Sequence, residues 1–237
     1  MKSKLSCFHL SIIFFFLTLV LTLFSWIGSI YGLGEVQSLL SAEGIRWYLG
    51  HVVENYVQCP ALGIVLVLSM GVGVGIQAGL FDVLKRFCKK EKQLSRKERR
   101  ALTLVSVALL VYVTLVGGAL LLPWNFLHGV TGSWFYSPFA KGFVYLLAMG
   151  MGLSGMVYGY VSDMFRSLYD VVEGMSCLIS CMAPGLVTLF FVVQFFASLE
   201  YTNLISWIGI SENMMDLFYL FFCYLPFLLW TIRTRNK

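Results

Sequence analysis

Charged side chains are scarce in this sequence of 237 residues, in which Asp, Glu, Lys and Arg together make up 12%. Soluble domains carry roughly 25% of such residues. Apolar residues make up 59% of the chain, and the mean hydropathy is +0.82. A soluble fold of this size could not bury so much apolar surface, so large patches would face water. The composition therefore excludes an ordinary water-soluble domain.

The few charges are also unevenly spaced, so that long stretches of the chain carry none. The six longest uncharged stretches contain 30, 27, 40, 21, 26 and 16 residues, at positions 5–34, 55–81, 101–140, 142–162, 174–199 and 217–232. A helix needs about 20 apolar residues to cross the hydrocarbon core of a bilayer. The sequence therefore predicts an all-α integral membrane protein that crosses the bilayer several times.

Clusters of side chains that hold metals or perform catalysis are missing from the sequence. The histidines His9, His51 and His128 lie far apart, and the six cysteines form no C-x-x-C pair. Cys177 and Cys181 share a helix face, but no His lies nearby to complete a set of metal ligands. Nor is there a group of Ser, His and Asp, or of Glu and His, with the pattern of a hydrolytic site. We therefore expect no enzyme activity, no metal site and no cofactor.

The basic residues are concentrated in one run, KRFCKKEKQLSRKERR at positions 85–100, which holds nine of the 17 Lys and Arg residues. Because such residues are enriched in the cytoplasmic loops of membrane proteins, the run predicts a cytoplasmic loop. With this loop inside, 15 positive residues lie inside and two, Arg46 and Lys141, lie outside. Both termini are then cytoplasmic. Contact of the run with anionic lipid or nucleic acid is the less favoured interpretation, and we expect no nucleic-acid partner.

We predict a single membrane domain over residues 1–237, with about six transmembrane helices at about 9–32, 60–82, 101–122, 140–161, 183–200 and 214–232. Two further helices are expected between the spans. A short extracytoplasmic helix within residues 34–58 has Ser41 as its N-cap. Residues 163–182 carry apolar side chains at helical period and charged ones on the other face, which predicts a cytoplasmic amphipathic helix.

Small residues recur at helical spacing in two of the predicted spans. Positions 70–79 have the sequence MGVGVGIQAG, and a similar pattern surrounds Gly155. A phosphate-binding glycine loop lies between a strand and a helix, whereas these glycines lie within apolar spans. Close packing of helices is the favoured interpretation, and local unwinding beside a solute path is the alternative. The expected packing positions are Gly71, Gly75, Gly79, Gly155 and Gly159.

Two blocks of the sequence resemble one family of membrane proteins. Residues 36–81 begin VQSLLSAEGIRW and include PALG and MGVGVG. This block resembles the extracytoplasmic helix and second span of the AbgT family of p-aminobenzoyl-glutamate transporters. Residues 155–209 begin GMVYG and include SCMAP and VVQF, and this block is similar to a span, an amphipathic helix and the next span of that family. The two blocks together cover about 100 of the 237 residues.

The resemblance implies a substrate and a site. The substrate would be p-aminobenzoyl-glutamate or a related aromatic acid. Gln194, Thr202 and Asn203 match the family's Q-F and W-S-N positions and would contact the substrate, with Tyr201 in place of the Trp. Family members also carry two inward-dipping hairpins, with the motifs S-D-A-G-Y-x-x-x-P-P and Y-R-I-G-D, which this sequence does not contain. The chain therefore resembles a shortened member that lacks the hairpin regions.

Two functions are compatible with these features, and the sequence leaves both open. The first is an AbgT-like transporter that acts as a homo-oligomer or with another membrane subunit, because six spans without hairpins would not enclose a path alone. The second is a non-transporting membrane partner that keeps the packing scaffold of the family. The absence of an Asp, Glu, Lys or Arg near the centre of any span, where ion-coupled transporters place such residues, favours the second. The intact sequence blocks favour the first, which is the leading hypothesis. Either protein would be a multi-pass protein of a bacterial inner membrane.

The charge distribution predicts which loops face outward. In a variant whose native cysteines are replaced, a cysteine at Ser133 should react with a thiol probe that cannot cross the membrane, because this position lies outside in our topology. A cysteine at Ser95, in the basic run, should react only after the membrane is permeabilised. Labelling of intact cells followed by mass spectrometry measures both reactions. The reverse pattern would contradict the topology.

Overall fold

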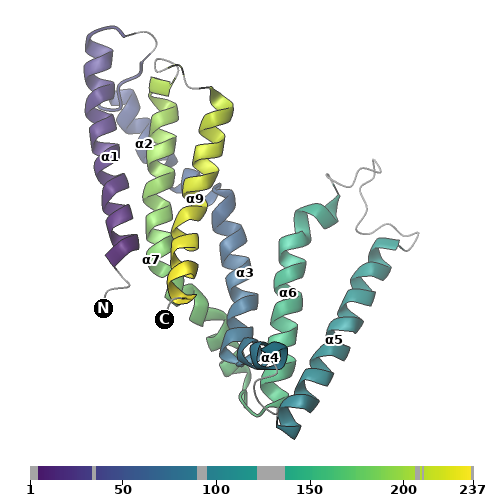
Figure 1. Cartoon of the computed structure of the whole chain (residues 1–237). Helices are drawn as coiled ribbons and strands as arrows, with labels where there is room; N and C mark the ends of the chain where they lie inside the picture. The colour runs from purple at the N-terminus through teal and green to yellow at the C-terminus, as the bar shows by residue number, and fades with distance from the viewer. Residues whose placement is uncertain are drawn as a thin grey trace. The chain divides into compact units, whose positions relative to one another are not determined.

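The computed structural model describes residues 5–33, 36–89, 95–121, 137–205, 209 and 211–235. The long elements of these residues are all helices: α1 (Leu5–Ile30), α2 (Ala42–Val57), α3 (Pro60–Gln77), α4 (Leu80–Lys89), α5 (Arg96–Leu121), α6 (Pro138–Val161), α7 (Leu168–Tyr201) and α9 (Glu212–Arg235) (Figure 1). Within this part of the chain, six helical segments are long and apolar enough to cross a membrane. The predicted all-α membrane fold is confirmed.

Apolar side chains cover the outer surfaces of the helices as well as the contacts between them. Helix α5 is the clearest case, with side chains between 49% and 68% exposed at Leu104, Val107, Leu110, Val113 and Leu115. Soluble monomers rarely expose contiguous apolar patches of more than a few hundred Å². The outer face of α5 is therefore suited to hydrocarbon and not to water.

Contacts among the helices divide the chain into two compact units. Unit 1 consists of residues 1–63 and 182–237, and it contains α1, α2, the C-terminal part of α7, and α9. Unit 2 consists of residues 64–181, and it contains most of α3, all of α4, α5 and α6, and the N-terminal part of α7. The candidate functional site described below lies in unit 1.

In unit 1, helix α7 contacts α1 and α9. The hydroxyl groups of Ser11 on α1 and Thr188 on α7 lie 2.7 Å apart and share a hydrogen bond. The ring of Phe14 on α1 packs edge-on against Phe195 of α7 and Phe222 of α9, with centroid distances of 5.5 and 5.4 Å. The start of α1 and the end of α9 lie at the same end of this unit (Figure 1). Helix α7 therefore supplies much of the core of unit 1, and its most buried apolar side chains are Leu189, Val192 and Val193.

Helix α2 begins where the sequence predicts. The side chain of Ser41 accepts a hydrogen bond from the backbone N–H of Gly44, with a nitrogen–oxygen distance of 3.0 Å. This is the N-cap geometry, in which a hydroxyl oxygen satisfies an N–H that has no partner within the helix. Glu43 in the first turn adds a negative charge where the helix dipole favours one.

Glycines in unit 2 allow the backbones of α3 and α6 to lie close together. A Cβ atom at Gly71 on α3 would overlap the carbonyl group of Ala148 on α6. A Cβ atom at Gly155 on α6 would lie 2.7 Å from the backbone nitrogen of Gly75 on α3. Such distances leave no room for a side chain. At Gly159, an added Cβ would overlap the ring of Phe165, which follows α6 in the chain.

Gly79 does not make a packing contact, and the prediction for this position is wrong. No heavy atom lies within 4 Å of the place where its Cβ would be, and its φ angle is +75°. Gly79 turns the chain from α3 into α4 in a left-handed conformation that costs other residues about 1–2 kcal/mol. The glycine spacing gave no sign of this turn. Helix α3 ends at Gln77, before the predicted end of the span at residue 82.

Residues 168–201 form the single helix α7, whereas the sequence predicted an amphipathic helix over 163–182 and a separate span over 183–200. Ser167 and Asp170 form a capping box at the start of α7. The Oγ of Ser167 accepts a hydrogen bond from the backbone N–H of Asp170 (3.4 Å), and Oδ2 of Asp170 accepts from the backbone N–H groups of Ser167 (2.9 Å) and Arg166 (2.7 Å). Pro184 lies inside the helix without ending it. A proline removes one backbone donor, and buried packing on both sides can hold the helix together across that gap.

The described part of the basic run forms a corner between α4 and α5. Arg86 forms an ion pair with Glu98 (2.8 Å), and Glu98 also accepts a hydrogen bond from the backbone N–H of Ser95 (2.9 Å). Lys97 pairs with Asp163 in the turn after α6 (2.8 Å), and its ammonium group holds the pKa of the Asp163 carboxyl below its ordinary value. The exposed pair of Lys97 with Asp163 contributes little to stability, whereas Val83 of α4 and Ala101 of α5 belong to one buried apolar cluster that holds the corner.

The contact between α3 and α6 predicts a specific response to small substitutions. Gly155→Ala should destabilise the protein by about 1–3 kcal/mol, because a methyl group must push two backbones apart. Gly142→Ala on the same helix is the control, since no atom lies within 4 Å of its added Cβ. The control should be neutral or gain about 0.5–1 kcal/mol from helix propensity. Thermal unfolding in detergent measures both, and equal melting temperatures would contradict the packing role.

Candidate functional site

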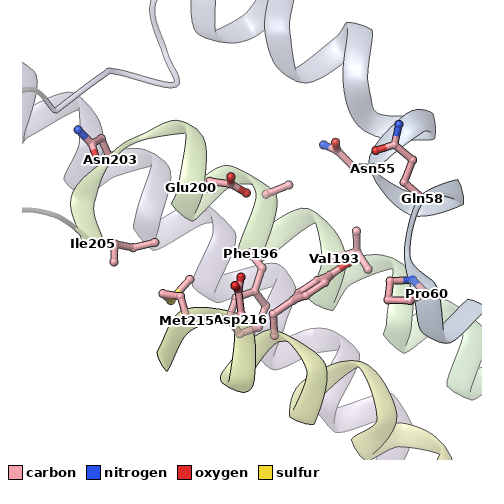
Figure 2. A pocket seen from close by; sticks show the side chains of 12 residues that line it. Asn55, Gln58, Pro60, Val193, Phe196, Glu200, Asn203, Ile205, Met215 and Asp216 are labelled. Carbon is pink, nitrogen blue, oxygen red and sulfur yellow. The ribbon is translucent and has the colours of Figure 1, made fainter. Parts of the chain in front are cut away.

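A cavity of about 480 Å³ lies in unit 1, where α2 and α7 end and α9 begins. We call it the α7–α9 cavity. Ligand pockets for small molecules have volumes of roughly 300–1,000 Å³, so the cavity is large enough for such a ligand. Its polar lining residues are Asn55, Gln58, Glu200, Asn203, Asp216 and Tyr219 (Figure 2).

The polar side chains come from three separate helices and the segment that follows α7. Figure 2 shows Asn55 and Gln58 at the end of α2, Glu200 near the end of α7, and Asp216 in the first turns of α9. Glu200 and Asp216 are exposed. The side chain of Phe196 is buried, and its ring packs against Tyr219 at a centroid distance of 5.6 Å. The lining of the cavity thus combines two exposed acidic side chains with a pair of packed aromatic rings.

Asn203 reaches the cavity because of the way α7 ends. The helix ends at Tyr201, and the backbone N–H of Asn203 donates a hydrogen bond to the carbonyl of Glu200 (3.1 Å). Asn203 has a φ angle of +54°, in the left-handed region that asparagine tolerates better than most residues. This conformation terminates helices and turns the chain away from the helix axis. Asn203 therefore has a structural role at the end of α7 in addition to its place in the cavity lining.

The structure does not bring the three predicted substrate-binding residues together. Asn203 lines the α7–α9 cavity, but Gln194 and Thr202 do not. Thr202 is fully buried, its hydroxyl donates to the carbonyl of Leu199 (3.1 Å), and its own carbonyl accepts from the backbone N–H of Gln37 (3.1 Å). Gln194 is 2% exposed and lines a different cavity. Substrate contact by these three residues stays a prediction.

Several lining residues were not singled out from the sequence as ligands. Asn55, Gln58, Asp216 and Tyr219 are ordinary polar residues at the ends of predicted helices, and more than 150 positions separate the first pair from the second. No local motif connects them. The sequence offers one indication. Polar residues accumulate at the end of the helix predicted within residues 34–58, at the end of the span predicted at 183–200, and at the start of the last span.

The two sequence blocks that resemble the AbgT family contact each other in unit 1. The ring of Trp47 on α2 stacks on Tyr201 of α7, with a centroid distance of 4.3 Å and an interplanar angle of 21°. The hydroxyl of Tyr56 on α2 donates a hydrogen bond to the carbonyl of Leu186 on α7 (3.0 Å). These contacts fix the end of α2 beside α7. They thereby position one wall of the α7–α9 cavity.

The chemistry of the cavity is that of hydrogen-bond acceptors. Glu200 and Asp216 carry carboxylates, and the side chains of Asn55, Gln58 and Asn203 add amide groups. Carboxylate and amide oxygens accept hydrogen bonds from amines, amides and hydrated cations. Within the part of the chain that the structure describes, no three His, Cys, Asp or Glu side chains are grouped so that they could hold a metal ion. The arrangement therefore suits the binding of a small molecule that carries N–H groups.

The chain matches the family described as "AbgT putative transporter family" over residues 7–90 and 85–217. A p-aminobenzoyl-glutamate transport protein of Escherichia coli (strain K12) is 31% identical over 86 residues. That stretch covers 32% of this chain and 17% of the relative, so the chain matches a small part of the relative's length.

Two solved structures are similar to this chain. The YdaH transporter of Alcanivorax borkumensis has a TM-score of 0.72 and 19% identity, and the alignment covers 85% of this chain and 74% of that one. MtrF of Neisseria gonorrhoeae, described within a class of antimetabolite efflux pumps, has a TM-score of 0.74 and 15% identity, with coverages of 94% and 80%. At these identities the similarity shows the fold alone.

Because Trp47 stacks on Tyr201, we predict that the ring of Tyr201 stabilises unit 1. Tyr201→Ala should lower stability by about 0.5–1.5 kcal/mol beyond the loss of buried area, because the ring pair is broken. Tyr31→Ala is the control, since Tyr31 is 77% exposed. Thermal unfolding of the two purified variants measures the difference. A melting temperature of Tyr201→Ala equal to that of the control would contradict a stabilising stack.

Proposed function

Because the chain belongs to the AbgT family of transporters, we propose that it moves p-aminobenzoyl-glutamate or a related aromatic acid across a bacterial inner membrane. The observation that carries the proposal is the family match, whose two ranges together run from residue 7 to residue 217. The named activity of the Escherichia coli relative supports this class of substrate. The chain also shares its fold with two transporters of known structure, and this supports transport as its function.

The topology in this proposal has six spans with both termini in the cytoplasm. The division of the positive residues, 15 inside and two outside, supports this orientation. The spans predicted at about 9–32, 60–82, 101–122, 140–161, 183–200 and 214–232 each overlap one of the six long apolar helical segments among the described residues. The chain would work as a homo-oligomer or with another membrane subunit.

The α7–α9 cavity is our proposed binding place for the amine end of the substrate. The substrate has an aromatic amine and an amide, and Glu200 and Asp216 can accept hydrogen bonds from their N–H groups. The ring of Phe196 can pack against the benzoyl group. The glutamate end of the substrate is anionic. Two like charges about 4 Å apart repel each other by roughly 1 kcal/mol even in water, so this end would point away from the two carboxylates.

A second candidate function, the non-transporting membrane partner, is favoured by the charge of the cavity. Its charged lining residues are both acidic, and no Lys or Arg is among the residues described as lining it. A transport site for a dianionic substrate would gain from cationic side chains. In this alternative, unit 1 keeps its packing contacts and serves another membrane subunit.

Uptake by proteoliposomes tests the proposal and the site together. Wild-type protein should take up labelled p-aminobenzoyl-glutamate saturably. The double variant Glu200→Gln with Asp216→Asn should raise the KM of uptake about tenfold, because neutral amide oxygens accept hydrogen bonds more weakly than carboxylates, by roughly 1.4 kcal/mol over the two acceptors. Glu43→Gln is the control, because Glu43 is exposed on α2 and does not line the cavity.

The outcomes separate the two candidates. An unchanged KM in the double variant would contradict the assignment of the cavity and leave transport standing. No uptake by correctly inserted wild-type protein, either alone or with added membrane subunits, would contradict transport and favour the partner function. Equal effects of the double variant and Glu43→Gln would show a general effect of surface charge.

A further inference from the structure

A groove of about 610 Å³ lies in unit 2, lined by α4, α5 and α6. We call it the α4–α6 groove. Its lining is mostly apolar, with Phe81 and Leu84 on α4, Leu109 and Val113 on α5, and Met151 on α6, and no charged residue is described as lining it. These five side chains are exposed, so the groove is open to the surroundings of the protein. At membrane depth those surroundings are lipid.

The hydroxyl groups in the lining do not direct a polar ligand. Ser106, Thr114 and Ser154 each donate a hydrogen bond to a backbone carbonyl of their own helix, at distances between 2.7 and 2.9 Å. Each hydroxyl has a single proton, and all three protons are therefore already used. A hydrocarbon chain needs no hydrogen bond and suits such a lining.

The length of the groove is that of one leaflet. Its lining residues on α5 extend from Leu102 to Thr114, which are 12 positions apart. At a rise of about 1.5 Å per residue this distance is roughly 18 Å. One leaflet supplies about half of the hydrocarbon core of about 30 Å. An acyl chain of a single leaflet can therefore follow the groove along α5.

One end of the groove meets the basic run. The ion pair of Arg86 with Glu98 (2.8 Å) joins α4 to α5, near the start of α5 (Figure 1). Arg86 follows the lining residue Leu84 by two positions, and Glu98 lies one turn before the lining residue Leu102. The cationic side chains at positions 85–100 therefore begin where the apolar lining ends.

Two of these cations lie on the faces that line the groove. Arg99 lies three positions before Leu102 and seven before Ser106, so it shares their face of α5. Lys85 lies four positions after Phe81 on α4. Both cationic side chains are exposed, and neither forms an ion pair with a residue that the structure describes. Their charges are available to an anionic group outside the protein.

We propose that the α4–α6 groove binds one anionic phospholipid, with an acyl chain in the groove and its phosphate paired with Lys85 and Arg99. Ammonium and guanidinium groups form strong, charge-assisted hydrogen bonds with phosphate oxygens. Basic side chains beside a span attract anionic head groups in the same way. In our topology the lipid belongs to the cytoplasmic leaflet. The site lies wholly in unit 2 and does not depend on the proposed transport function.

The combination of apolar groove and basic end favours this occupant over two others. A zwitterionic phospholipid could fill the groove, but its head group also carries a positive charge, which Lys85 and Arg99 repel. A nucleic acid could pair with the same cations, but it has no apolar chain for the groove.

Titration of the full-length protein in neutral detergent tests the proposal, with bound lipid counted by native mass spectrometry. Phosphatidylglycerol and phosphatidylcholine with the same acyl chains are the probes. Phosphatidylglycerol should bind roughly 25-fold more tightly, from about fivefold for each of the two cations. Glycerol phosphate, which has no acyl chain, should not compete at the same concentration. Equal affinities of the two lipids, or competition by glycerol phosphate, would overturn the proposal.

Two neighbouring arginines provide a matched pair of variants. Arg99→Gln should weaken binding of phosphatidylglycerol about fivefold. Arg100→Gln removes the same charge from the next position, but Arg100 shares its face of α5 with Leu104 and Val107, which do not line the groove. Its effect should be clearly smaller. Equal effects would show attraction by the overall charge of the basic run and would overturn the site.

A second pair of variants locates the acyl chain. Leu109→Trp partly fills the groove and should weaken binding of phosphatidylglycerol about tenfold, whereas Leu104→Trp on the outer face of α5 should bind as the wild type does. The two leucines are 44% and 49% exposed, and a single symmetric peak in gel filtration verifies that each variant folds. Equal binding by the two variants would overturn the placement of the chain in the groove.

Discussion

The hydrogen bond from Nε2 of Gln194 to the carbonyl of Val52 holds the two helices on which unit 1 depends. Both groups are largely shielded from water, where a polar group gains from each partner it finds, and such interhelical bonds contribute about 1–2 kcal/mol. The bond fixes α2 along α7, and the stacked rings of Trp47 and Tyr201 continue the contact. Because α2 lines both cavities of this unit, the same contact determines the shape of each.

The two cavities differ in what surrounds their polar groups. Glu200 and Asp216 are exposed, and the interaction of an exposed group with a charged solute is weaker than that of a buried one. The amide of Gln194 is buried among apolar side chains, where a single hydrogen bond has a larger effect. The linings of the two cavities in unit 1 therefore differ in charge, since one includes two acidic residues and the other includes no charged residue.

The sequence predicted those features that depend on local chemistry. The N-cap Ser41 could be predicted because its hydroxyl bonds to a backbone N–H only three residues away. The long helices could be predicted because the apolar stretches that form them are also local features of the sequence. The packing role of Gly79 and the break expected between residues 182 and 183 were predicted wrongly, since spacing and residue type do not say whether a helix turns or continues. Gln194 and Thr202 match two motifs of the family that lie eight positions apart. Thr202 follows the end of α7 and is buried against the backbone of Leu199, so it does not share the cavity that Gln194 lines. The cavities themselves join helices that are far apart in sequence, and this information is absent from any single motif.

The unbroken helix α7 is longer than a bilayer is thick. Its 34 residues, at a rise of about 1.5 Å each, extend over roughly 51 Å, whereas the hydrocarbon core measures about 30 Å. Tilting alone would require an angle above 50°, outside the roughly 0–40° that transmembrane helices adopt. Several turns must therefore lie among head groups or in water, and the turns with Asp170 and Glu173 are suited to that place. The thickness of the surrounding bilayer consequently determines how many turns of α7 lie outside the hydrocarbon core.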